Sequence, residues 1–219
     1  MKRPSARAIL AALTATVLQA CGSSPATGNA VKADNCVVRL HGKGDRGSPT
    51  VVSNGIADVS PTGNADGWGG RQWVYFPDGQ YAVARDVVSA SADAAGCRRV
   101  VIDGFSNGAS FAASMLCHGE TLGGRVVGIV IDDPVTDAAT EHCKRSAATK
   151  VALYWSGALD AQAPAGTLCS TIDWTCEGGV ILGIDAFAAD IGASIHTTPS
   201  QQHDWYRDAP ELTAWFASP

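Results

Sequence analysis

The segment best suited to chemistry is Gly104-Phe105-Ser106-Asn107-Gly108, in which a serine stands between two glycines. A strand-like apolar run over residues 99–103 precedes it, and a helix-like run over residues 109–117 follows it. A nucleophilic serine must be presented at a sharp turn, and flanking glycines let neighbouring backbones approach closely. The pattern therefore predicts Ser106 as a nucleophile at a helix N-terminus, where backbone N–H groups favour a developing oxyanion.

A serine hydroxyl is a weak nucleophile, so the same chemistry requires a histidine base oriented by a carboxylate. Asp160 follows the strand-like residues 151–155, and His203 lies between the last strand-like run and a closing helix-like segment. Loops at the carboxyl ends of strands gather at one edge of an open α/β sheet. We therefore predict a catalytic triad of Ser106, Asp160 and His203.

Other residues compete for the acid and the base. Asp132 and Asp133 end the strand-like run before Asp160, and either is an alternative carboxylate. His196 lies in an apolar stretch that is typical of a packed side chain, whereas His118 and His142 adjoin cysteines in predicted loops. His203 remains the predicted base.

Short apolar runs alternate with helix-like segments along the chain. The predicted strands are residues 36–40, 73–76, 99–103, 126–132, 151–155 and 193–197. Apolar residues at three- and four-residue spacing predict helices over residues 81–95 and 109–116, and a closing helix that starts near residue 208. Several strands lack polar alternation, as in sheets covered on both faces. The pattern predicts an α/β fold with a doubly wound, mostly parallel sheet flanked by helices.

Residues 47–71 are the least regular part of the chain, because Gly, Ser, Asn and Asp are frequent there. We expect either a long surface loop near the active site or an irregular connection with Trp68 packed inside. Trp68, Trp73 and Trp174 are candidates for lining a ligand cavity or for filling the core.

The N-terminus has the layout of an export signal. Three cationic residues precede an apolar run over residues 8–20, which is too short to span a membrane as a helix. The run ends in Leu18-Gln19-Ala20-Cys21, which resembles a bacterial lipoprotein signal, and this resemblance implies lipidation of Cys21. An ordinary secretory leader is the alternative. Residues 1–20 are thus a predicted signal peptide, residues 21–34 a flexible tether, and residues 35–219 one folded domain.

Charge and cysteine content agree with export. The 219 residues hold 16 Lys and Arg against 21 Asp and Glu, and loss of residues 1–20 removes three of the cations. Nucleic acid is an improbable partner for so acidic a chain. Apart from Cys21, six cysteines remain, which suits three disulfides in an oxidising compartment; their pairing stays open, although Cys169 and Cys176 are close enough to form a local loop.

These motifs, taken together, resemble the α/β-hydrolase superfamily over residues 36–217. Leu40-His41-Gly42-Lys43-Gly44 is similar to its His-Gly oxyanion loop, which implies that the backbone N–H groups of Lys43 and Asn107 form the oxyanion hole. The elbow and the cysteine-rich body resemble secreted carboxylesterases and polyester depolymerases. The chain length is similar to that of cutinases, although the elbow departs from their usual Gly-Tyr-Ser-Gln-Gly.

The resemblance implies a carboxylic ester hydrolase that forms an acyl-enzyme on Ser106, without a metal or organic cofactor, and with no large lid over the site. Small or polymeric esters are the expected substrates, and the expected membrane contact is through a lipid on Cys21. Thioesters or peptides are alternative substrates for the same triad. A non-catalytic envelope lipoprotein that binds a ligand or partner is a different class of alternative.

Overall fold

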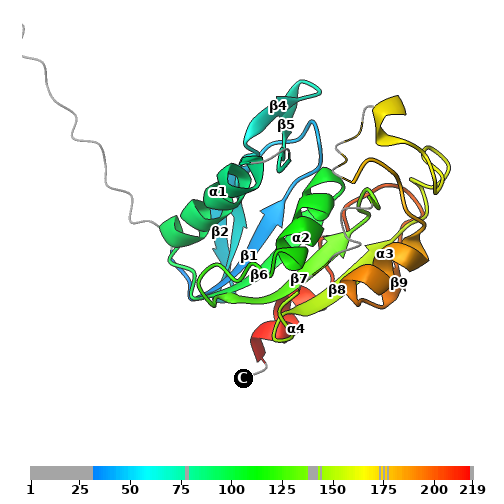
Figure 1. Cartoon of the computed structure of the whole chain (residues 1–219). Helices are drawn as coiled ribbons and strands as arrows, with labels where there is room; N and C mark the ends of the chain where they lie inside the picture. Colours follow the sequence, from blue (N-terminus) through cyan, green and yellow to red (C-terminus); the bar gives the residue numbers. More distant parts are fainter. Residues whose placement is uncertain are drawn as a thin grey trace, which may run out of the picture.

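The centre of the molecule is a seven-stranded sheet with the strand order β2-β3-β1-β6-β7-β8-β9 (Figure 1). This computed structural model describes residues 32–76, 79–137, 143, 145–172, 174, 176 and 178–217, so the predicted signal peptide, Cys21 and His142 lie outside it. The sheet strands are β1 (Asn35–Leu40), β2 (Ser48–Ser53), β3 (Ile56–Ser60), β6 (Arg99–Phe105), β7 (Val126–Asp132), β8 (Lys150–Trp155) and β9 (Ile195–Thr197). Neighbouring strands are parallel, except that β2 runs antiparallel to β3.

Helices cover the two faces of this sheet unequally. The α-helices in the described residues are α1 (Gln80–Ala94), α2 (Asn107–Cys117), α3 (Ile184–Ile191) and α4 (Glu211–Ala217), and a short 3-10 helix spans Cys169–Thr171. The first three share the larger core with one face of the sheet, where Phe111, Ile129 and Phe187 are buried. On the other face α4 packs against β6 and β7 (Figure 1). The predicted α/β class, with a mostly parallel sheet between helices, is confirmed.

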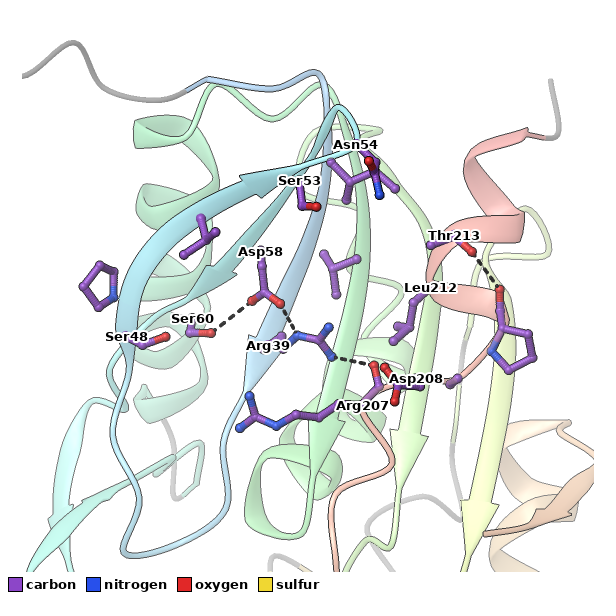
Figure 2. A pocket seen from close by; sticks show the side chains of 16 residues that line it. Arg39, Ser48, Ser53, Asn54, Asp58, Ser60, Arg207, Asp208, Leu212 and Thr213 are labelled. Carbon is purple, nitrogen blue, oxygen red and sulfur yellow. Dashed lines mark hydrogen bonds and ion pairs between the residues drawn. The ribbon is translucent and has the colours of Figure 1, made fainter. Parts of the chain in front are cut away.

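The part of the second face that α4 leaves uncovered is a groove of about 630 Å³. Figure 2 shows it between β1, β2 and β3 on one side and residues 207–213 on the other. Arg39 lies on its floor and forms ion pairs with Asp58 and Asp103, both at 2.6 Å. The Arg39 guanidinium also donates a hydrogen bond to the backbone carbonyl of Arg207, at 3.3 Å. This side of the sheet therefore holds the chain that leads into α4.

The expected loop over residues 47–71 is instead a pair of hairpins. β2 and β3 are joined by Asn54 and Gly55, and a small separate sheet of β4 (Ala65–Gly67) and β5 (Gly70–Gln72) is joined by Trp68 and Gly69. All four turn residues have positive φ, as two-residue turns of type I′ require. Asn-Gly between apolar runs is a strong hairpin signal. The loop expectation failed because turn residues dominated the composition.

The predicted strand over residues 73–76 was also wrong. Its backbone is held by asparagine side chains instead of a neighbouring strand: Trp73 exchanges hydrogen bonds with the Asn107 amide, and Val74 does so with the Asn64 amide. Trp73 is fully buried, which explains the apolar pattern. The remaining predicted strands occur within two residues of the expected bounds, and α3 is a helix that the sequence reasoning missed.

Three disulfides join Cys36 to Cys97, Cys117 to Cys143, and Cys169 to Cys176. The first links the start of β1 to the loop before β6. Asp34 in the predicted tether already contacts this loop, because its carbonyl accepts hydrogen bonds from the backbone N–H groups of Arg98 and Arg99, both at 2.8 Å. Within the described residues, no helix has the length and apolar character needed to cross a membrane.

Candidate functional site

Three loops at the carboxyl edge of the sheet bring a serine, a histidine and a carboxylate into one hydrogen-bonded chain. Ser106 follows β6, Asp133 follows β7 and His203 follows β9. His203 Nε2 lies 2.9 Å from Ser106 Oγ, and His203 Nδ1 lies 2.7 Å from Asp133 Oδ2. A base and its orienting carboxylate at these distances form the arrangement that activates a serine.

Ser106 occupies the sharp turn that the sequence predicted. It is the N-cap of α2, with φ +53° and ψ −120°, a backbone conformation that L-residues rarely adopt. A Cβ on Gly104 would overlap the Gly108 carbonyl, and a Cβ on Gly108 would overlap the Leu40 carbonyl. Both glycines therefore serve the close approach of backbones that the motif requires.

The structure places Asp133, not Asp160, beside His203, so the predicted carboxylate is corrected to one of its two alternatives. The physical reason lies in the turn after β8. There Ser156 is directed to Asp133, donating from its backbone N–H to Oδ1 at 2.9 Å and from its hydroxyl to Oδ2 at 2.6 Å. The chain then turns outward through Gly157, and Asp160 is exposed on that turn.

Asp133 is fully buried, and its carboxylate accepts hydrogen bonds from both Ser156 and His203. A carboxylate that accepts hydrogen bonds from several donors is held in one orientation. Sequence reasoning missed Ser156. The only feature of the sequence that could have indicated Ser156 is its position one residue past β8, beside the carboxyl end of β7.

The loop that carries His203 is fixed to the sheet by two buried carboxylates. Asp103 on β6 accepts a hydrogen bond from the Trp205 indole at 3.1 Å, and Asp132 at the end of β7 accepts one from the backbone N–H of Tyr206 at 2.6 Å. Phe105 stacks on Trp205 and contacts the His203 ring, with centroids 4.7 Å apart for the latter pair. The imidazole is thus held from its own loop and from β6.

Arg39, which faces the groove in Figure 2, extends this support. Its guanidinium contacts Asp103 and the Arg207 carbonyl together. Asp103 therefore lies between a charged donor and the Trp205 indole. Sequence reasoning had placed Asp103 at the end of a strand without a role. Asp132, weighed as an alternative acid, contacts the loop of the base and not the base itself.

The predicted oxyanion loop lies against the serine. A Cβ on Gly42 would stand 3.2 Å from Ser106 Cβ. His41 is buried and braces this loop: its Nε2 accepts from the Gly63 N–H at 3.0 Å, which leaves Nδ1 to donate to the Gly42 carbonyl at 2.8 Å. Burial lowers the pKa of His41, in agreement with a neutral ring. Lys43 and Asn107 flank Ser106 in the same cavity.

Two hollows meet at Ser106. The smaller, about 100 Å³, is lined by apolar side chains that include Val135, Leu159 and Trp174. The larger and more open, about 390 Å³, is bounded by Gly42, Gly44, Asp45 and Phe105. Lys43, Trp68, Ser106 and His203 border both. Trp68 and Trp174 thus face the site, whereas Trp73 belongs to the core.

Comparison with known proteins identifies the architecture. A carboxylesterase from Bacillus cereus is 14% identical, with a TM-score of 0.54 over 85% of this chain and 91% of that chain. The chain has the α/β-hydrolase fold. TT1662 from Thermus thermophilus (11% identical, 86% and 91% covered) and YahD with malic acid (16% identical, 84% and 93% covered) each give a TM-score of 0.50. No family model and no curated protein matches the sequence.

The α/β-hydrolase fold places a nucleophile elbow where Ser106 lies, between a central parallel strand and the helix that follows it. In this fold the order along the chain is nucleophile, acid, histidine. Ser106, Asp133 and His203 keep that order. At such low identities the likeness describes the fold, and the chemistry has to be argued from the site itself.

Asp132 makes the stability of the site depend on pH. Burial, together with the charges of Asp103 and Asp133, raises the pKa of Asp132 to about 8, against the pull of the Tyr206 N–H. A free aspartate has a pKa of about 4. The folded protein therefore retains a proton that the unfolded chain releases between these values. This contribution to stability is complete below about pH 4 and is lost as the pH rises to about 8.

We predict that Asp132→Asn becomes more stable relative to wild type as the pH rises from 5 to 8. Asparagine keeps an oxygen for the Tyr206 N–H but carries no titratable proton. The difference in free energy of unfolding should increase by up to about 1.4 kcal/mol per pH unit. Urea unfolding at four pH values measures it, with the exposed Asp160→Asn as control. A difference that stays constant with pH contradicts a buried, protonated Asp132.

Proposed function

We propose that this protein is a serine hydrolase that cleaves carboxylic esters through an acyl-enzyme on Ser106. The observation that carries the proposal is the continuous hydrogen-bonded chain from Ser106 Oγ through His203 to the buried Asp133. A binding protein has no need of a serine in a strained turn, a base at its hydroxyl and a carboxylate behind that base.

The proposed reaction begins when His203 Nε2 takes the proton of Ser106 as the oxygen attacks the ester carbonyl. Asp133 orients the ring and stabilises the imidazolium that forms. His203 then returns the proton to the leaving alcohol, and the C–O bond of the ester breaks. Water, activated by the same imidazole, attacks the acyl-enzyme and releases the acid, which restores Ser106.

The negative charge on the carbonyl oxygen is assigned to the backbone N–H groups of Lys43 and Asn107. The Asn107 N–H lies in the first turn of α2, where amides lack partners within the helix and the helix dipole favours negative charge. The Asn107 side chain accepts from the backbone N–H of Trp73 and donates to its carbonyl, and these two bonds fix the backbone at Asn107. Each donor of such a pair typically contributes about 10²–10³ in turnover.

Esters are the favoured substrate class among acyl compounds. The small apolar hollow beside Ser106 suits a short hydrocarbon group, and the open hollow leaves room for the other part of the ester. The Bacillus cereus protein of the same fold is named a carboxylesterase. An aliphatic or aromatic ester therefore fits the site without a charged recognition group.

We also propose that the protein is exported and anchored by a lipid on Cys21. The motif Leu18-Gln19-Ala20-Cys21 supports cleavage before Cys21, and three disulfides are compatible with an oxidising compartment.

Removal of the nucleophile tests the enzyme proposal. We predict that Ser106→Ala lowers turnover of p-nitrophenyl butyrate by about 10⁶-fold, because the attacking oxygen is lost. A fluorophosphonate probe should label wild type and not the variant. Ser53→Ala, which alters an exposed serine on β2, is the control. Equal hydrolysis and labelling of wild type and Ser106→Ala would discard the proposal.

A second pair of variants tests the corrected acid. We predict that Asp133→Asn lowers turnover by about 10⁴-fold, since an amide favours the wrong tautomer of His203. Asp160→Asn changes an exposed side chain and should remain within about a factor of two of wild type. The two are compared by kcat for the same ester. The reverse ranking would restore Asp160 as the acid.

Export is tested by mass spectrometry of the protein isolated from bacterial membranes. We predict a mature chain that begins at an acylated Cys21, and a Cys21→Ala variant that lacks the acyl mass and leaves the membrane fraction. A mature protein cleaved elsewhere and without acyl groups would favour the ordinary secretory leader.

A further inference from the structure

Trp68 has two features that are unusual for a residue in a hairpin turn. Its side chain is 62% exposed, the highest value among large hydrophobic residues in the described part of the chain. Its φ is +42°, in the left-handed region that disfavours residues with a bulky side chain. The equivalent position of a two-residue turn is usually Asn, Asp or Gly. An exposed aromatic ring on a strained backbone indicates a ligand contact.

The hairpin that carries Trp68 is fixed to the proposed oxyanion loop. The Gly44 N–H donates to the Arg71 carbonyl, and the Arg71 N–H donates to the Asp45 carbonyl, both at 2.8 Å. Gly70 has no room for a Cβ, because it would overlap the Gly44 backbone. The Trp68 ring is therefore presented from a rigid support and not from a loose loop.

Trp68 borders both hollows that meet at Ser106. The Lys43 ammonium lies 4.4 Å from the centroid of the Trp68 ring, a cation–π contact that helps to fix the ring. An apolar cavity of about 150 Å³ is known to hold benzene. The smaller hollow, at about 100 Å³, is below that size, so a ring belongs in the open hollow of about 390 Å³.

We propose that Trp68 is a specificity-determining residue that selects esters with a short aliphatic group on one side and an aromatic ring on the other. This inference rests on the proposed esterase function. A flat ring can stack on the indole, whereas a saturated ring of equal carbon number lacks the quadrupole interaction. Such stacking corresponds to a preference of about threefold to tenfold.

The experiment compares matched esters in which a methylene separates the ring from the ester, so that intrinsic reactivity is nearly equal within each pair. One pair is benzyl acetate and cyclohexylmethyl acetate; the other is ethyl phenylacetate and ethyl cyclohexylacetate. We expect wild type to favour the aromatic member of at least one pair by about threefold to tenfold in kcat/KM. Trp68→Asn should reduce that ratio to less than about twofold, and Trp68→Tyr should retain part of it.

Asparagine is chosen because Asn-Gly is a preferred pair for this turn, so the hairpin is retained. The unfolding temperature of Trp68→Asn should be no lower than that of wild type. Val51→Asn removes a side chain that is 61% exposed and lines only the groove behind the sheet, and it should keep the aromatic preference. A wild-type ratio below twofold in both pairs, or a ratio unchanged in Trp68→Asn, overturns the proposal.

Binding to Ser106→Ala separates this inference from the proposed function. The Trp68 indole N–H resonance, identified by its loss in the double variant with Trp68→Asn, should shift with benzyl acetate more than with cyclohexylmethyl acetate. An indole response without hydrolysis by wild type would support the ring contact and remove the esterase. Hydrolysis without ring preference and without an indole response would support the esterase and remove the ring contact. If hydrolysis, ring preference and indole response are all absent, both proposals are overturned.

Discussion

The close approach of β1, β6 and α2 is the constraint on which the site depends. Gly104 and Gly108 allow backbone contacts that any Cβ would prevent, and these contacts force Ser106 into its unusual conformation. A serine raised above the sheet in this way can be reached only from neighbouring strand ends. The loop after β1 lies against the serine and is the proposed oxyanion loop, and the acid and the base come from the loops after β7 and β9.

His203 is positioned by the Arg39–Asp103 ion pair, which lies on the face of the sheet opposite the larger core. Asp103 is completely buried, and burial raises its pKa to about 6 while Arg39 opposes that rise. The Trp205 indole donates to Asp103, and the Arg207 carbonyl accepts from Arg39. The chain after His203 is therefore fixed at two points. The groove in Figure 2 exposes the Asp58 end of the same arrangement. Replacement of Arg39 would thus affect the base from a distance.

Local signals were sufficient for most of the parallel strands, for the elbow and for the histidine that contacts Ser106. The segment from β6 through the turn into α2 has a recognisable pattern of glycines and apolar residues. His203 was predicted because it precedes the closing helix. Asp133 and Asp160 could not be separated in that way, because each follows a strand end. What decides between them is the direction of Ser156, a contact between residues 23 apart. Such contacts leave no periodic trace in a single sequence.

The tryptophans illustrate the same limit. Trp68 and Trp73 are five residues apart, yet one is 62% exposed and the other fully buried. Trp73 is buried because Asn107 satisfies its backbone, so that no neighbouring strand is needed. Trp68 is exposed because the Trp68-Gly69 turn directs it away from the core. Neither hairpin was predicted: the Asn54-Gly55 pair is a hairpin signal that the expected loop overlooked, and the second turn has no such signal, since tryptophan is an unusual residue there.

The position of the acid also decides which part of the chain can shape the substrate cavity. With Asp133 after β7, the long connection from β8 to α3 carries no triad residue. It supplies Leu159, Gln162 and Trp174 to the small hollow instead, and the Cys169–Cys176 disulfide restrains it. A substitution among these lining residues can change the cavity without moving Ser106, His203 or Asp133. Conversely, Asp133 is held by Ser156, the first residue of this connection, whereas the residues that line the small hollow come later in it.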